Sequence, residues 1–251
     1  MSLSEGRPDG VASFSQPVDA FGSPDQPLTY GTIHQLLTKD PVHSWVAYVL
    51  GVIPILRQEK GGSFSGGAKI LLRSTVPEGK GVSSSAAVEV ATMQAVAAAY
   101  DIPLEATELA TLCQKVENHI AGAPCGIMDQ MTVVHGRANQ LLALLCQLAE
   151  IQGYVSIPAE YAFWGIDSGV RHAVSGADYG SVRVGAFMGL KLLQLQSGDT
   201  FDSYLTRLTP ALFEQHYREM LPITLKGEAF LEQYGELPDR VTAVDPEQMY
   251  A

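Results

Sequence analysis

The sequence is poor in cysteine and has no long apolar run. It contains three cysteines among 251 residues, Cys113, Cys125 and Cys146, with neither a CxxC pair nor zinc-finger spacing. This odd, sparse set argues against a disulfide framework and fits a reducing compartment. No stretch reaches the roughly 18 apolar residues that a membrane-spanning helix needs, and the polar start does not resemble a signal peptide. We therefore expect a soluble cytoplasmic protein with no membrane partner.

Positive charge is also scarce, since 16 basic residues face 27 acidic ones and the net charge is −11. Such a surface repels nucleic acids and anionic membranes, so we expect neither as a partner. ATP is not excluded, because a local loop and a metal ion decide whether an acidic protein binds it. With 46% hydrophobic residues, the chain can form one large domain or two small ones with a sizeable core.

Apolar periodicity along the chain predicts a mixture of strands and helices. Residues 68–76 alternate as a strand does, and Pro77 ends the pattern. Residues 84–100 predict a helix that is apolar on all sides, with Glu89 as its one charge, so it should lie inside the core. Further helices are predicted near 105–120, 128–131, 182–196 and 214–232, and further strands near 133–134, 141–145, 154–157 and 163–166. This mixture predicts a mixed α/β or α+β class.

The run Pro77-Glu78-Gly79-Lys80-Gly81-Val82-Ser83-Ser84-Ser85-Ala86-Ala87 separates the predicted strand from the apolar helix. Glycines let the backbone approach a ligand closely, and the free amides and partial positive charge of a helix N-terminus suit phosphate. A Gly-x-Gly alone is more often a strand–turn–helix junction with serine as a plain cap. The complete run favours phosphate binding, although its lysine does not stand where the common P-loop has it.

Two carboxylates form the second informative feature. Glu117 lies four residues after Cys113, which places it against the apolar stripe of its helix. A carboxylate there is costly unless it is paired or binds a cation. Asp129 follows a glycine-flanked loop that can fix its position. The alternatives, a surface glutamate and a capping aspartate, remain open at this stage.

The loop at 77–87 and the segment 113–130, with its core Pro124-Cys125-Gly126-Ile127-Met128-Asp129-Gln130, resemble the GHMP kinases, in particular the galactokinase branch. The amino-acid sequence across 76–130 and 163–188 is most similar to plant-type L-arabinokinases. This resemblance implies a GHMP-kinase-like α+β fold. It places an N-terminal nucleotide-binding domain at 1–159 and an incomplete C-terminal domain at 160–251.

The resemblance also implies an activity and a set of site residues. The activity is transfer of the ATP γ-phosphoryl group to the anomeric hydroxyl of a monosaccharide, with ATP and Mg²⁺ as cofactors. The residues implied to bind the ATP phosphates are Gly79, Lys80, Gly81, Val82, Ser83, Ser84 and Ser85. Ser85 and Glu117 would hold Mg²⁺, and Asp129 would be the catalytic base or the anion that orients the sugar. Gly126, Asp129 and Tyr179 would contact the sugar.

Two family motifs are not found in this sequence: the early Arg-containing motif that ends in Gly-Glu-His-x-Asp-Tyr, and the late glycine-rich motif. Two interpretations stay open, a truncated reading frame and a reduced relative that no longer catalyses. A non-catalytic sugar- or nucleotide-binding protein is therefore the alternative function, and a fragment without any ligand is a third. Absent first strands would expose sheet edges and apolar surface, so we expect a homodimer that covers them.

Overall fold

The computed structural model describes residues 13–23, 25–64, 66–170 and 177–251. The chain is divided into two compact units, residues 1–173 and 174–251. Among the described residues, no helix is both long and apolar enough to cross a membrane. The structure is mostly helical with two small sheets, which fits the α+β class. The assignment of kinase domains to 1–159 and 160–251 stays a prediction.

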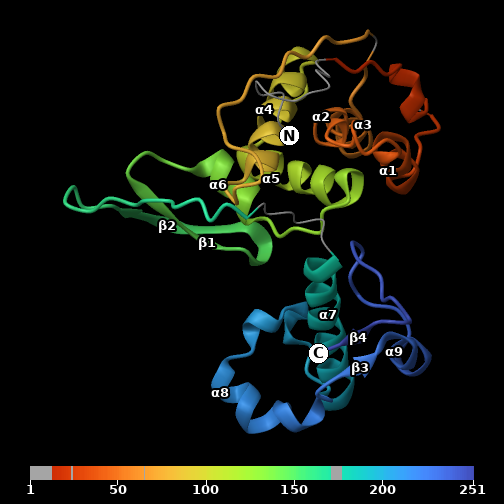
Figure 1. Ribbon diagram of the computed structural model, residues 1–251, viewed down its shortest axis with the longest axis vertical. Coiled ribbons are helices and arrows are strands. Elements are labelled where there is room, and N and C mark those ends of the chain that lie inside the picture. Colours follow the sequence, from red (N-terminus) through yellow and green to blue (C-terminus); the bar gives the residue numbers. More distant parts are fainter. Residues whose placement is uncertain (1–12, 24, 65, 171–176) are drawn as a thin grey trace. The chain divides into compact units, whose positions relative to one another are not determined.

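Helix α4 (Ser84–Ala99) is the central element of the first unit (Figure 1). Residues 86–90 in its first half are buried or half-buried, as the apolar sequence predicts. From Ala91 onward one side is exposed, and that side carries Ala91, Ala95 and Ala98. The prediction of a helix inside the core is thus confirmed for the half that follows the glycine-rich loop.

Helices α2 (Val46–Leu50), α3 (Val52–Lys60) and α5 (Ala106–Lys115) pack against α4. Helix α1 (Tyr30–Thr38) packs against α2 and the segment Val116–Ala121. Local sequence sets their ends. The Thr29 hydroxyl accepts a hydrogen bond from the Thr32 amide at the start of α1, and Gly61, with φ of 66°, ends α3. Their shared core includes Ile33, Ile55, Met93 and Ile120, each fully buried.

The chain after α5 continues as a π-helical segment, Val116–Ala121, before α6 (Met128–His135). Gly122, with φ of 80°, ends the π-helical segment. The His34 ring lies where a Gly122 side chain would stand, since a Cβ there would come within 2.7 Å of it. His34 Nδ1 also lies 2.9 Å from the Ile120 carbonyl oxygen. Helix α1 therefore anchors the turn that leads toward α6.

The first unit has one β-hairpin, in which β1 (Gln140–Leu145) pairs antiparallel with β2 (Glu150–Ser156). A bulge between Ala143 and Leu144 shifts the register. The hairpin packs on α6 through Met131, Leu144 and Ile151. The predicted strand at 141–145 is confirmed. The predicted strand at 133–134 is wrong, because these residues belong to α6.

Two further predicted strands, at 68–76 and 163–166, are also wrong in the described structure. Neither segment is regular secondary structure, and neither pairs with a described strand. A strand is defined by its ladder, and alternation in one segment cannot supply the neighbour. Their apolar side chains are correspondingly exposed, with Leu71 at 95%, Trp164 at 88% and Ile166 at 93%.

The second unit is built on the long helix α7 (Ala177–Ser197), which confirms the predicted helix at 182–196. The other elements are α8 (Pro210–Leu212), α9 (Gly227–Tyr234), and the short pair β3 (Leu225–Lys226) and β4 (Met249–Tyr250). Short 3₁₀ turns of this unit lie at Phe201–Ser203, Leu205–Arg207 and Arg218–Met220. Two more, at Val18–Phe21 and Gln147–Ala149, belong to the first unit. The small core of this unit consists of Val184, Met188, Leu192, Phe230 and Tyr250.

The broad helix predicted at 214–232 is wrong as a single element. A π-helical turn at Phe213–Tyr217 and the 3₁₀ turn after it stop before Leu221, and α9 starts at Gly227. Leu221 is extended, with φ of −102° and ψ of 134°. Pro222 explains the break, since proline disfavours helical geometry in the residue before it and lacks an amide hydrogen.

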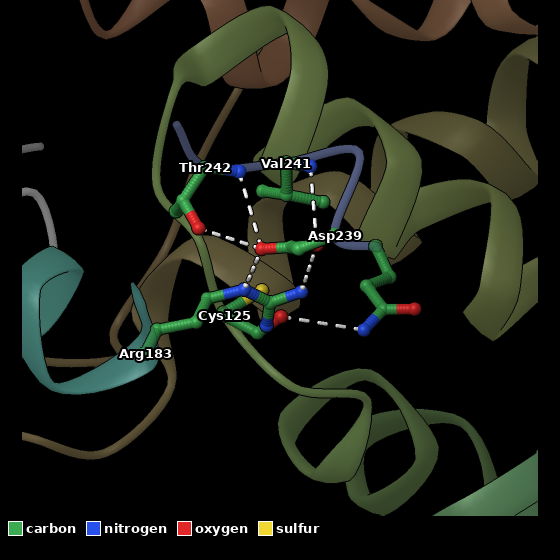
Figure 2. A network of polar contacts seen from close by, with 6 residues as sticks. Cys125, Arg183, Asp239, Val241 and Thr242 are labelled. Atoms are coloured by element: carbon green, nitrogen blue, oxygen red, sulfur yellow. Dashed lines mark hydrogen bonds and ion pairs between the residues drawn. The ribbon is translucent and has the colours of Figure 1, made fainter. Parts of the chain in front are cut away.

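A partly buried ion pair fixes the loop after α9 to α7 (Figure 2). Arg183 donates two hydrogen bonds to the Asp239 carboxylate, at 2.8 and 2.9 Å. The Val241 amide and the Thr242 amide and hydroxyl donate to the same carboxylate, at 3.1, 3.2 and 2.6 Å. The Asp239 side chain is only 4% exposed, so its charge depends on these donors.

Candidate functional site

The glycine-rich loop has alternating backbone handedness. Gly79, Gly81 and Ser83 have φ of 67°, 70° and 59°, whereas Lys80 and Val82 between them are not among the residues with positive φ. Successive residues of alternating hand turn their amide groups toward one side and form a concavity that suits an anion. Glycine adopts this geometry without strain, but Ser83 adopts it at a steric cost.

Helix α4 begins directly after this loop. Its first intrahelical bond runs from the Ala87 amide to the Ser83 carbonyl, at 3.0 Å. The amides of Ser84, Ser85 and Ala86 precede that bond and belong to the unpaired first turn of the helix. Ser83 makes no side-chain capping bond, so the plain N-cap interpretation of the serine run does not describe this turn. Unpaired amides at a helix start are well suited to phosphate oxygens.

Lys80 is the basic residue of the loop, and it is paired. Its Nζ lies 2.7 Å from the Asp167 carboxylate, which comes from the segment after β2. This contact and the Gly169 amide lower the pKa of Asp167. Both side chains are substantially exposed, and exposed pairs contribute little free energy. A bound phosphate can therefore compete with Asp167 for Lys80, a contact that motif reading alone did not predict.

Glu117 lies in the π-helical segment and is almost completely buried, at 3% exposure. Burial raises the pKa of its carboxyl, hydrogen bonds from Ser85 and Cys125 oppose that shift, and the charge of Asp129 adds to it. The ion pairs in the described part of the chain do not include Glu117. The interpretation of Glu117 as a plain surface residue is thus wrong. Single π-helical turns within helices often occur at functional sites.

A second carboxylate, Glu89, lies one helical turn after Ser85 on α4 and is fully buried. Burial, with the nearby charge of Glu117, raises the pKa of Glu89 well above its usual range. Gln130 of α6 lies between the two carboxylates and is also fully buried. Its Nε2 donates to Glu117 at 2.5 Å and lies 3.4 Å from Glu89. Sequence reasoning assigned no role to Glu89 or Gln130.

Asp129 is next to Gln130 in the first turn of α6 and is half-buried. Its charge raises the pKa of both Glu89 and Glu117, so its carboxylate lies near them. Gly126, in the loop before α6, is exposed, and a Cβ there would meet no atom within 4 Å. The structure therefore gathers Ser85, Glu117 and Asp129 in one region, with open space above the backbone of Gly126.

Tyr179 belongs to α7 in the second unit and is 44% exposed. Its contact with a sugar, like that of Gly126, stays a prediction. The Val-Arg-His run on which part of the resemblance depends ends in Arg171 and His172, which lie outside the described residues.

The residues near Glu117 fit a magnesium ion. Mg²⁺ prefers hard oxygen ligands and usually takes one or two from the protein, the others coming from substrate phosphates and water. A buried glutamate that hydrogen-bonds the Ser85 hydroxyl at the start of α4 provides such a pair. No described group of three or more His, Cys, Asp or Glu side chains could hold a metal by itself. The donors therefore suit an ion that arrives with nucleotide.

Comparison with known proteins shows which family residues 47–137 are similar to. Residues 47–137 match the family described as GHMP kinases N terminal domain. The chain is 43% identical to L-arabinokinase from Arabidopsis thaliana over 267 aligned residues, which cover 95% of this chain and 26% of that protein. It is 35% identical to a galactokinase from Actinobacillus pleuropneumoniae, covering 76% of this chain and 50% of the relative. A galactokinase from serotype 3 of that species, strain JL03, is 36% identical, with 61% and 40% covered.

The chain thus spans between a quarter and a half of the length of these relatives. The matched residues include the loop at 79–85, Glu117 and Asp129. Residues 47–137 therefore match the GHMP kinase N-terminal domain family, and the chain is similar in sequence to L-arabinokinase and the galactokinases.

Proposed function

We propose that this chain contains the nucleotide-binding part of an ATP-dependent sugar 1-kinase of the L-arabinokinase and galactokinase type. The observation that carries the proposal is the direct connection between the glycine-rich loop at 79–85 and the carboxylate of Glu117. The loop of alternating handedness enters α4 at Ser84, and the hydroxyl of Ser85 hydrogen-bonds the buried Glu117. A phosphate held on the loop would thus meet a hard-oxygen ligand pair for its metal ion.

In this proposal the ATP phosphates lie along the loop from Gly79 to Ser85, bound by backbone amides and serine hydroxyls, with Lys80 adding a positive charge. Ser85 and Glu117 hold Mg²⁺, which when bound neutralises charge on the transferred phosphoryl group. Asp129 accepts or orients the proton of the sugar hydroxyl, and Gly126 and Tyr179 contact the sugar. Phosphoryl transfer depends mainly on this kind of positioning and charge neutralisation.

The proposal is tested by a coupled assay of ADP release with L-arabinose, D-galactose and D-glucuronate, in the presence of Mg²⁺. Sugar-dependent ADP release is the expected result. Nucleotide binding without turnover on any of these sugars would instead support the alternative, a sugar- or nucleotide-binding protein. A thermal-shift measurement with ATP and Mg²⁺ separates that outcome from a chain that binds nothing, because a ligand stabilises the fold that binds it.

We also propose that the chain forms a homodimer. The support is the exposure of large apolar side chains on the segments 68–76 and 163–166, with Leu71, Trp164 and Ile166 each at least 88% exposed. Large apolar side chains exposed to this degree are found on surfaces that another chain covers. We expect a mass of two chains in light scattering at micromolar concentration. A mass of one chain across the concentration range would exclude the dimer.

A further inference from the structure

The Gln130 side chain connects the three elements that carry the candidate site. Gln130 itself lies in the first turn of α6, directly after Asp129. Its Nε2 donates to Glu117 of the π-helical segment at 2.5 Å and lies 3.4 Å from Glu89 of α4. A weaker contact joins the same nitrogen to Cys125 Sγ, at 3.8 Å. Gln130 is fully buried, so water does not compete for these contacts.

Only the nitrogen of the Gln130 side-chain amide makes hydrogen bonds, so these bonds alone set the orientation of the amide. Gln130 Oε1 is buried and has no hydrogen-bond partner. Rotating the amide by half a turn would place that oxygen against two carboxylates, which donate nothing when ionised. The NH₂ group has two hydrogens and can serve both acids. A neutral donor thus stands between two acidic groups, whose direct contact would be repulsive when both are ionised.

The Glu117 carboxylate consequently has one oxygen, Oε2, committed to Gln130. Its hydrogen bond with Ser85 links the carboxylate to the start of α4. Mutating a group that holds a metal-binding carboxylate or imidazole in place typically costs about 10- to 100-fold in metal affinity or activity. Without the amide, Glu117 could rotate within its pocket, and α6 would lose its side-chain contact with both carboxylates.

We propose that Gln130 is a positioning residue that holds Glu117 in the orientation needed to bind the metal ion of a metal–nucleotide complex. This inference rests on the proposed function, and it assigns a role to a residue that touches neither nucleotide nor sugar. Gln130 also links that metal ligand to Asp129, its neighbour in α6, so the proposed base and the proposed metal ligand move together.

The test measures how much Mg²⁺ strengthens the binding of a non-hydrolysable ATP analogue, AMP-PNP, by calorimetric titration with and without the metal. Gln130→Met keeps the side-chain length and removes the donor. Thr92→Val is the matched control, because Thr92 is buried on α4 and its hydroxyl has no partner. Glu117→Gln reports on the metal ligand itself.

We expect Gln130→Met to reduce the Mg²⁺-dependent gain in affinity about 10-fold and to change metal-free binding by less than about twofold. Thr92→Val should leave both quantities as in the wild type. Retention of the full gain in Gln130→Met, with loss of it in Glu117→Gln, would overturn the positioning role and leave the proposed function intact. Absence of any Mg²⁺-dependent gain in the wild type would overturn the metal site and the positioning role together.

A second measurement uses the wild type, in case Gln130→Met does not fold. The Gln130 side-chain NH₂ should give a proton pair protected from solvent exchange in NMR spectra. We expect this pair to shift when Mg²⁺ and AMP-PNP are added together, and not when AMP-PNP is added alone. A pair that does not respond to the metal complex would contradict the proposal, since a ligand bound to Glu117 must change the charge on the oxygen that Gln130 contacts.

Discussion

Replacing Asp129 with asparagine is expected to lower kcat for sugar phosphorylation by about 10²- to 10⁴-fold, the range typical of a positioned general base. Asparagine keeps the size of the side chain and most of its polar contacts, but it cannot accept a proton from the sugar hydroxyl. The measurement is sugar-dependent ADP release by the variant and by the wild type at saturating ATP, Mg²⁺ and sugar. A kcat within about threefold of the wild type would exclude the role of base, because general base catalysis contributes at least 10²-fold.

The loss should not result from a damaged metal site. The charge of Asp129 raises the pKa of Glu117, so removing that charge makes Glu117 easier to ionise, which offsets the loss of one nearby negative charge from the cation site. Asp129 is only half-buried, which limits the effect on folding. Affinity for AMP-PNP with Mg²⁺ should therefore stay near that of the wild type. Asp101→Asn is the matched control, the same chemical change in an exposed turn.

Local sequence was sufficient to predict the left-handed glycine geometry of the loop at 77–87, because this geometry depends on residues that are adjacent in the chain. Glycine is the residue that adopts positive φ without cost, and Gly79 and Gly81 both do so. Ser83 was not predictable in this respect. A serine before a helix normally caps it with extended geometry, whereas Ser83 is left-handed and leaves its side chain uncommitted to the helix.

The three buried polar side chains near the loop, Glu89, Glu117 and Gln130, could be predicted only in part. The position of Glu117 on an apolar stripe indicated a costly carboxylate, and the structure buries it. Glu89 gave a comparable signal, as a single charge in an apolar helix one turn after Ser85. That Gln130 lies between them was beyond local reasoning, because three separate elements have to pack before these side chains meet.

The strand predicted at 68–76 failed for a related reason. Alternation identifies a segment that can form a strand with different faces, but the partner must come from elsewhere. Pro222 is the opposite case. The helix break there follows from the chemistry of one residue, because proline disfavours helical geometry in the residue before it. The sequence alone could have predicted this break, but the helical pattern on both sides of Pro222 favoured a single long helix.

Replacing Arg183 with methionine is expected to destabilise the second unit by about 3 kcal/mol, since it leaves the nearly buried charge of Asp239 without its cationic partner. Asp239 is only 4% exposed, and both of its oxygens accept from Arg183. For a unit of this size such a loss corresponds to a fall in Tm of about 10 °C or more. Differential scanning calorimetry measures it, and Arg207→Met is the matched control because the ion pair of Arg207 is exposed.

The pH dependence of this effect has a defined sign. Burial pushes the pKa of Asp239 upward, but hydrogen bonds from Arg183 and Thr242 outweigh it and lower the pKa. A carboxyl whose pKa is lower in the folded protein stabilises the fold above its unfolded pKa of about 3.9 and loses that contribution as the pH falls. Arg183→Met removes the strongest of these donors. The difference between variant and wild type should therefore be full near pH 7 and shrink as the pH falls below about 4.

The same substitution separates the contributions of the two units to function. Tyr179 lies one helical turn before Arg183 on α7, whereas the loop at 79–85 and Glu117 belong to the first unit. If Tyr179 contacts the sugar, Arg183→Met at a temperature that unfolds the second unit should abolish sugar-dependent ADP release. Binding of AMP-PNP with Mg²⁺ should persist, because its proposed ligands lie elsewhere. Loss of nucleotide binding at the same temperature as turnover would show that the two units unfold together, and that the nucleotide site depends on both.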